Sequence, residues 1–146
     1  MQDGRPLAIL DPTTRIGAWF REHLAGDIVG WLTTVAPDGT PQSSVIAFLW
    51  NDESVLLYSQ PGALKVRNIA AHPRVAFHLQ CDPFGKHLLT LEGIAAPDHT
   101  AAAGEAWAAY LDKNRDAFGQ WGMDPAEARR EYSLPIRIRP TRIRAH

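Results

Sequence analysis

A predicted β-hairpin in residues 28–50 constrains the fold more than any other feature of the chain. Residues 28–35 (IVGWLTTV) are rich in β-branched and aromatic side chains, which favour an extended strand. The turn signal Pro37-Asp38-Gly39 follows, in which glycine can adopt a positive φ, and residues 41–50 (PQSSVIAFLW) are the expected returning strand. Strands joined by so short a connection run antiparallel, so the chain is expected to build an antiparallel sheet.

The rest of the chain continues this pattern of short strands. Asn51-Asp52-Glu53 is expected to form a second turn, which makes the next strand the third of a meander. Glu92 interrupts a run of apolar and threonine residues, and we expect it to pair with a basic side chain on a neighbouring strand rather than to act as a catalytic acid. The predicted strands after the hairpin are residues 54–59, 74–80, 87–96 and 133–146, the last interrupted near Pro140.

Helical patterns flank these strands. Thr13 or Thr14 is the expected N-cap of the first helix, and Asp124-Pro125 combines an N-cap with a first-turn proline for the last. Residues 1–12 are expected to be an extended arm. One predicted helix ends near Leu24, and a second covers the segment that carries Lys65. A third runs from Asp98 to about Lys113, and the last ends at Tyr132. Without repeats or low-complexity linkers, residues 1–146 are expected to form a single domain, a mainly β fold with α elements in which helices flank a small six-stranded antiparallel barrel.

Composition narrows the possible functions. A net charge of −1 gives no global attraction to nucleic acid or to an anionic membrane, and no segment approaches the roughly 20 apolar residues of a membrane helix. A single cysteine, Cys81, argues against an internal disulfide and suits a reducing compartment. The six histidines are scattered without ligand spacing, so no metal site is expected. With no signal-peptide pattern at the N-terminus, we expect a cytoplasmic protein that binds neither nucleic acid nor membrane.

Four arginines near the C-terminus, Arg137, Arg139, Arg142 and Arg144, give the one argument for nucleic-acid binding. They are expected to share one strand face on either side of Pro140. We expect this face to be a solvated or ion-paired edge rather than a ligand site.

The strongest candidate site lies in residues 58–73 (YSQPGALKVRNIAAHP). A strand there delivers the chain to a short helix with Lys65 and Arg67 in its first turns. Free backbone N–H groups and the positive end of a helix dipole bind anions, and the hydroxyls of Ser44 and Ser59 are expected close by. Such a set suits a phosphate group, and the neighbouring apolar strand surfaces suit a flat ring system. A solvated basic helix that only connects two strands is the alternative.

Three segments resemble the pyridoxamine-phosphate-oxidase-like, flavin-binding split barrels: GWLTTVAPDGTPQSSVIAF, LLYSQPGALKVRNIAAHPRVAFHL and LLTLEGIA. The ending PIRIRPTRIR is similar to an actinobacterial branch described as probable deazaflavin (coenzyme F420)-dependent enzymes. The resemblance implies a six-stranded split barrel that works as a homodimer with two cofactor sites at the subunit interface. It also implies that Lys65 meets the cofactor phosphate, helped by Ser59 and the backbone near Ala63 and Leu64. Along the ring system and its polyol chain it places Ser44, Val45 and Ile46, with Tyr58 beside them, while Asn68 either fixes the helix or reaches the cofactor.

One departure from the family pattern bears on the cofactor. FMN-using oxidases of this family usually carry an arginine where this chain has Ser44, so the resemblance favours F420 over FMN. The anionic oligoglutamate tail of F420 would give Arg67 or the C-terminal arginines a group to bind. The implied function is an F420-dependent oxidoreductase that passes a hydride to a small organic acceptor. The accompanying proton would come from solvent or from a tyrosine such as Tyr58 or Tyr110.

Three other functions stay open at this stage. The chain could be an FMN-binding oxidoreductase on the same scaffold, a non-catalytic flavin- or haem-binding protein, or a dimeric interaction module without a cofactor. Trp107, Phe118 and Trp121 could form an aromatic substrate surface, although packing in the core or at a dimer contact is the favoured interpretation.

Overall fold

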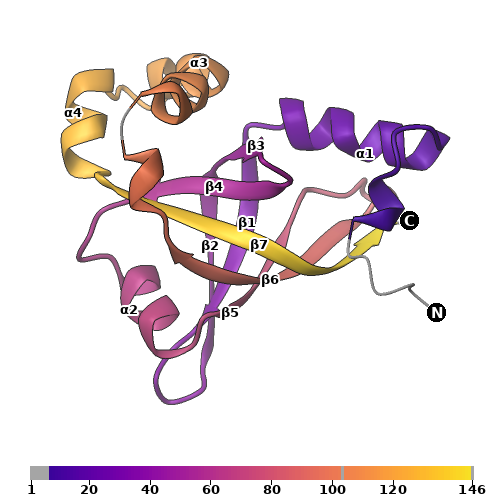
Figure 1. Ribbon diagram of the computed structural model, residues 1–146, viewed down its shortest axis with the longest axis horizontal. Coiled ribbons are helices and arrows are strands. Elements are labelled where there is room, and N and C mark those ends of the chain that lie inside the picture. The colour runs from indigo at the N-terminus through magenta and orange to yellow at the C-terminus, as the bar shows by residue number, and fades with distance from the viewer. Residues whose placement is uncertain (1–6, 103, 146) are drawn as a thin grey trace.

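The computed structural model describes residues 7–102 and 104–145, which form one seven-stranded antiparallel sheet with helices around it (Figure 1). The strand order is β2-β1-β5-β6-β7-β4-β3. The strands are β1 (Val29–Val35), β2 (Pro41–Ala47), β3 (Leu49–Asn51), β4 (Ser54–Ser59), β5 (Arg74–His78), β6 (Leu89–Pro97) and β7 (Leu134–Ala145).

The two edges of this sheet are parts of one bent segment. Strands β2 and β3 stand at opposite ends of the strand order, yet Phe48 alone separates them in the chain. The first part of the segment pairs with β1 and the last part with β4, so the sheet curls and its edges meet. The predicted mainly β split-barrel fold is therefore confirmed, with seven strands rather than six because the strand predicted over residues 41–50 breaks at Phe48.

Alternation along β4 shows how the sheet separates two apolar layers. Every residue of β4 is buried. Val55 and Leu57 point into the barrel core, whereas Leu56 and Tyr58 point outward into a second cluster beneath the later helices. Because a strand presents alternate residues to opposite faces, a fully buried strand must be covered on both sides.

The helices cover the ends and one outer side of the barrel (Figure 1). Their caps confirm two predictions: the Thr14 hydroxyl accepts a hydrogen bond from the Gly17 N–H at 3.0 Å, and the Asp124 carboxylate accepts from the Glu127 N–H at 3.3 Å. No helix in the described part of the chain is long and apolar enough to span a membrane. The helices are α1 (Arg15–Gly26), α2 (Leu64–Ala71), α3 (Glu105–Gln120) and α4 (Pro125–Glu131), with short 3-10 turns η1 (Ala8–Leu10) and η2 (His99–Ala101).

Two predicted segments were wrong in detail. The helix expected from Asp98 begins at Glu105, because Asp98 caps the separate turn η2 and Gly104 breaks the chain direction with a φ of 77°. The predicted extended arm contains η1, in which Leu10 is fully buried against the barrel core. Residues 1–6 of that arm lie outside the described residues.

A β-bulge between β6 and β7 explains the C-terminal pattern. The register shifts between Glu92 and Gly93, opposite Pro140. Ile138 and Ile143 are both fully buried although strict alternation would place them on opposite faces. The same shift places the arginines before Pro140, which have odd numbers, and those after it, which have even numbers, on one outer face of the strand. This shared face was predicted.

Gly93 is required at this bulge, because an added Cβ would lie 2.6 Å from the Arg139 carbonyl oxygen and 2.8 Å from the Ile138 Cγ2 atom. We expect Gly93→Ala to lower the free energy of unfolding by about 1–3 kcal/mol, since the backbone oxygen cannot move without disturbing the sheet. Denaturant unfolding measures this change. The control is Gly26→Ala, where the new Cβ has no neighbour within 4 Å; equal stability of the two variants would contradict the prediction.

Candidate functional site

Two adjoining cavities meet at Lys65, which lines both of them. The first, called here the aromatic cavity, has a volume of about 330 Å³ and lies between the sheet and helices α3 and α4. The second, called the polar cavity, has a volume of about 160 Å³ and lies between β1, β2 and α2. The aromatic cavity is lined by Val29, Val45, Ile46, Ala47, Tyr58, Lys65, Trp107, Tyr110, Phe118, Trp121, Met123, Ala128 and Tyr132. The polar cavity is lined by Thr34, Gln42, Ser43, Ser44, Leu64, Lys65 and Asn68.

Asn68 fixes helix α2 to the first two strands. Its side-chain NH₂ group donates hydrogen bonds to the Thr34 hydroxyl at 2.9 Å and to the Gln42 Oε1 atom at 2.8 Å. The side chain is fully buried, and its Oδ1 atom has no partner among the described residues. Of the two roles considered for Asn68, the structure shows that it fixes the helix, and it leaves one acceptor available beside the polar cavity.

Lys65 brings an unpaired cation to both cavities. The side chain is half-buried, and it forms no ion pair with any described residue. Burial lowers the pKa of Lys65 from its ordinary value. The N–H groups of Leu64 and Lys65 at the start of α2 also have no hydrogen-bond partner in the described part of the chain. An ammonium and free N–H groups at a helix N-terminus together form a site for an anion.

Strand β2 places the other predicted residues by its register with β1. Ser44 pairs with Leu32, Val45 with Trp31, and Ile46 with Gly30. Ser44 therefore lies at the polar cavity, while Val45 and Ile46 lie at the aromatic cavity. Val45 is 49% exposed, so the sheet side of the aromatic cavity reaches the surface.

Tyr58 contributes a buried side chain to the sheet side of the aromatic cavity. Its hydroxyl donates a hydrogen bond to the Ala101 carbonyl oxygen at 2.6 Å, and burial raises its pKa to about 12. The pKa of Tyr110 is raised too, first by burial and then by the neighbouring hydroxyls of Tyr58 and Tyr132. Both phenols are therefore neutral and weakly acidic at physiological pH.

Three predicted site residues line neither cavity. The Ser59 hydroxyl is buried and donates to the Gln60 carbonyl oxygen at 3.0 Å. Ala63 is the N-cap of α2 and supports the helix start through its backbone, and Arg67 is exposed. The structure thus brings together Ser44, Val45, Ile46, Tyr58, Leu64, Lys65 and Asn68.

Sequence analysis missed several lining residues. Thr34 and Gln42 are polar residues on the inward side of their strands, where both accept hydrogen bonds from Asn68. An inward polar side chain in an apolar strand could have indicated that they belong to a site. Tyr132 follows α4, and its distance in sequence from the other lining residues left no local signal.

Helix α3 is held beside the aromatic cavity by its contacts with the break at Phe48. The Lys113 amine donates to the Phe48 carbonyl oxygen at 2.7 Å and lies 3.6 Å from the centroid of the Phe48 ring. The Asn114 amide also donates to this carbonyl, at 3.4 Å. The same atom that marks the end of β2 therefore positions the helix that carries Trp107, Tyr110 and Phe118.

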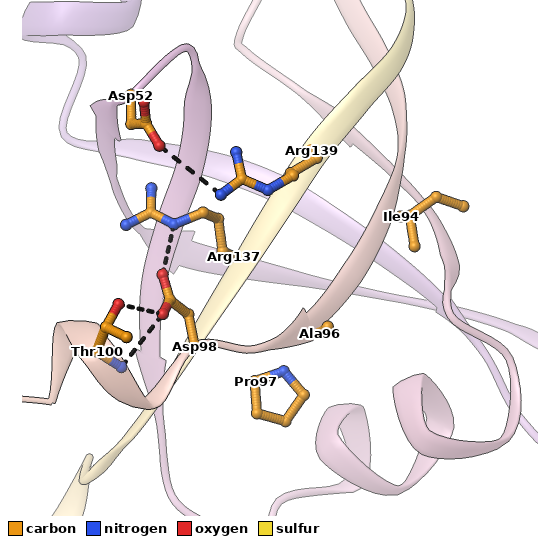
Figure 2. Close-up of a pocket in the computed structure, with 8 residues that line it drawn as sticks. All are labelled: Asp52, Ile94, Ala96, Pro97, Asp98, Thr100, Arg137 and Arg139. Carbon is orange, nitrogen blue, oxygen red and sulfur yellow. Dashed lines mark hydrogen bonds and ion pairs between the residues drawn. The ribbon is translucent and has the colours of Figure 1, made fainter.

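A larger hollow of about 540 Å³ lies over β6 and β7 beside the β3–β4 turn, and Figure 2 shows its lining. Arg137 donates to the Asp98 carboxylate at 2.7 Å, and Arg139 lies 3.7 Å from the Asp52 carboxylate. Hydrogen bonds from Thr100, followed by Arg137, lower the pKa of Asp98. The cations of this hollow are already matched by carboxylates, so it has no free charge for an anionic ligand.

The predicted ion pairing of these arginines is confirmed here and at the far end of β7, where Arg144 lies 3.1 Å from Glu92. The predicted edge is not observed, because β7 lies between β6 and β4 in the strand order. Glu92 is thus the cross-strand partner of an arginine, as predicted. Among the described residues, no group of three or more histidine, cysteine, aspartate and glutamate side chains is placed to hold a metal ion.

Two comparisons of the sequence with known proteins point to the same family. A family model for pyridoxamine 5'-phosphate oxidase matches residues 17–146. The pyridoxine/pyridoxamine 5'-phosphate oxidase of Rubrobacter xylanophilus is 29% identical over 130 residues, which cover 83% of this chain and 58% of that relative, less than two thirds of its length.

Solved structures share the fold. An F420 reductase is 30% identical with a TM-score of 0.62, and the match covers 85% of this chain and 94% of the other. HutZ, the haem storage protein of Vibrio cholerae, is 18% identical with a TM-score of 0.68, covering 90% and 95%. At this lower identity the likeness concerns the fold alone.

The buried amine of Lys113 makes stability depend on pH. Burial lowers its pKa to about 8, whereas an unfolded lysine keeps its proton to about pH 10.4. Between these values unfolding takes up a proton, so the free energy of unfolding rises with pH. Between pH 8 and pH 10, we expect the free energy of unfolding of the wild type to rise by about 1–2 kcal/mol more than that of Lys113→Met, after allowance for solvent screening.

Urea unfolding at several pH values measures this difference. The exposed Lys86 offers a control, because Lys86→Met should leave the pH dependence as in the wild type. Parallel stability curves for the wild type and Lys113→Met would contradict the prediction.

Proposed function

The chain belongs to the pyridoxamine 5'-phosphate oxidase family, and we propose that it is an F420-dependent oxidoreductase that transfers a hydride between the deazaflavin and a small organic acceptor. The observation that carries the proposal is the unpaired Lys65 amine where the polar and aromatic cavities meet. If an anionic group of a ligand binds beside Lys65, a ring system attached to that group would lie next to the aromatic cavity.

The residues of both cavities fit such a cofactor. Lys65 and the first N–H groups of α2 would bind the phosphate, and the unpartnered Oδ1 atom of Asn68 would accept a hydrogen bond from a cofactor hydroxyl. Ser44, Val45 and Ile46 would lie along the polyol chain and the ring, with Tyr58 beside them. The bound reduced deazaflavin supplies a hydride, while the protein supplies binding, orientation and exclusion of water.

Charge favours F420 over FMN. Lys65 is the one charged residue that lines the polar cavity, and all of its lining residues belong to the described chain. The phosphate of FMN is a monoester with a charge of about −1.5 to −2 at neutral pH, whereas the phosphodiester of F420 carries a single charge. One cation therefore balances the phosphate group of F420 better than that of FMN, and the F420 reductase at 30% identity supports the same choice. FMN is the second candidate cofactor, because the chain belongs to a family of flavin-binding oxidases.

The tyrosines bear on the source of the proton. The Tyr58 hydroxyl is committed to the Ala101 carbonyl, and the raised pKa values of Tyr58 and Tyr110 make both phenols weaker acids. Solvent that enters past the partly exposed Trp121 is the proton source that this arrangement favours.

We also propose that the protein acts as a cytoplasmic homodimer. Val45 at the aromatic cavity and Leu64 at the polar cavity are 49% and 53% exposed. A second copy of the chain would cover these apolar side chains and complete both cavities, and the outward Arg67 would then be available to an anionic cofactor tail. Sedimentation velocity tests the dimer; a monomer at micromolar concentration, with F420 still bound, would contradict it.

Lys65→Ala tests the cofactor site. We expect F420 affinity to fall by about 1.5–3 kcal/mol, the usual contribution of a charge-assisted hydrogen bond, which is roughly a 10- to 150-fold change in Kd. Isothermal titration calorimetry with F420 and, in parallel, with FMN measures this effect and the cofactor preference. The matched control is Lys86→Ala on the β5–β6 turn, which should bind as the wild type does. Equal Kd values for Lys65→Ala and Lys86→Ala would remove Lys65 from the site.

A further inference from the structure

The helical side of the aromatic cavity has features that cofactor binding does not use. This side, called here the helix wall, consists of Trp107, Tyr110, Phe118, Trp121, Met123 and Tyr132. Together with Tyr58 on the opposite side, it gathers all three tyrosines of the chain around one cavity. Trp107, Tyr110 and Phe118 are buried in the outer apolar cluster, as the favoured interpretation predicted, and they also border this open cavity of about 330 Å³.

The helix wall is held in place by ring contacts. The Tyr58 ring lies 4.9 Å from the Trp107 ring at 88° and 4.7 Å from the Tyr110 ring at 61°. The Phe118 and Trp121 rings follow at 6.0 Å, and Trp121 is 47% exposed. Edge-to-face packing fixes the inner rings, whereas Trp121 lies at the mouth of the cavity, where an entering ligand would meet it.

Charge restricts what this wall can bind. No carboxylate lines the aromatic cavity in the part of the chain that the structure describes, and its one cation, Lys65, is assigned to the cofactor phosphate. Burying a charged ligand without a counter-ion is costly. The hydroxyls of Tyr110 and Tyr132 have no hydrogen-bond partner among the described residues, so they are available to a neutral polar group.

We propose that the helix wall binds an uncharged, flat and largely apolar acceptor that carries one or two hydrogen-bonding groups, met by the hydroxyls of Tyr110 and Tyr132. This inference rests on the proposed function, in which the cofactor ring occupies the strand side of the cavity along Val45 and Ile46. Phosphorylated acceptors are disfavoured at the wall, because no second cation lines the cavity; Arg129 lies 5.6 Å from the Trp107 ring but outside the lining.

Two probes with the same ring system test the ligand class: neutral 2-naphthol and anionic 2-naphthoate. Calorimetry at pH 7 is carried out on the protein saturated with F420 and, separately, on Lys65→Ala, in which the lining cation is absent. We expect 2-naphthol to bind at least tenfold more tightly than 2-naphthoate in both cases. Equal or tighter binding of 2-naphthoate would overturn the inference, as would displacement of 2-naphthol by F420, because acceptor and cofactor have to bind together.

Variants locate the probe. Trp121→Ala should weaken 2-naphthol binding at least fivefold, and Trp121→Phe should restore most of it. The control is Phe84→Ala, an aromatic residue that is 88% exposed on the β5–β6 turn and remote from the cavity lining. Unchanged binding in Trp121→Ala would contradict the proposed wall.

The two proposals can fail separately. If F420 does not bind the wild type, while Lys65→Ala still prefers 2-naphthol, the cofactor assignment is wrong and the ligand class stands. If F420 binds as expected but neither naphthalene discriminates, the cofactor assignment stands and the ligand class is wrong.

Discussion

The buried amide of Asn68 is the interaction on which the candidate site depends. Its two hydrogen bonds, to Thr34 and Gln42, fix helix α2 across the ends of β1 and β2. A buried polar group that loses its partner costs about 1–3 kcal/mol, so this arrangement resists rearrangement of the helix. Because α2 is held there, the Lys65 amine and the first N–H groups of the helix lie where the two cavities meet. The proposed anion site is thus a consequence of how the helix is attached to the barrel.

The break in the sheet at Phe48 has a similar role for the other half of the site. One carbonyl group accepts hydrogen bonds from both Lys113 and Asn114, and it also marks where the chain leaves β2 and begins β3. The carbonyl at the point where the barrel closes therefore also helps to position α3. The aromatic cavity lies between the sheet and this helix. The curled sheet supplies one wall, and a helix held at a fixed distance supplies the other.

The sequence predicted those features that depend on neighbouring residues, such as the hairpin and the Thr14 cap, because a few adjacent side chains decide them. The break at Phe48 was missed because it depends on pairing with two strands that are distant in the chain. Ser59 was expected to help Lys65 at the phosphate, and Arg67 to add charge to the helix start or to bind the anionic tail of F420. Alternation in β4 instead buries Ser59, and the helical period turns Arg67 toward solvent. Asn68 combines a structural role with a free acceptor atom, which a sequence pattern alone does not separate.

In the proposed complex, the unpaired Lys65 amine binds the phosphate of a deazaflavin cofactor at the junction of the two cavities. A crystal structure of the protein with F420 tests this claim most directly. We expect the phosphate to contact the Lys65 amine and the N-terminus of α2, with the ring system in the aromatic cavity. A phosphate bound instead in the hollow beside Arg137 and Arg139, with Lys65 in solvent, would contradict it.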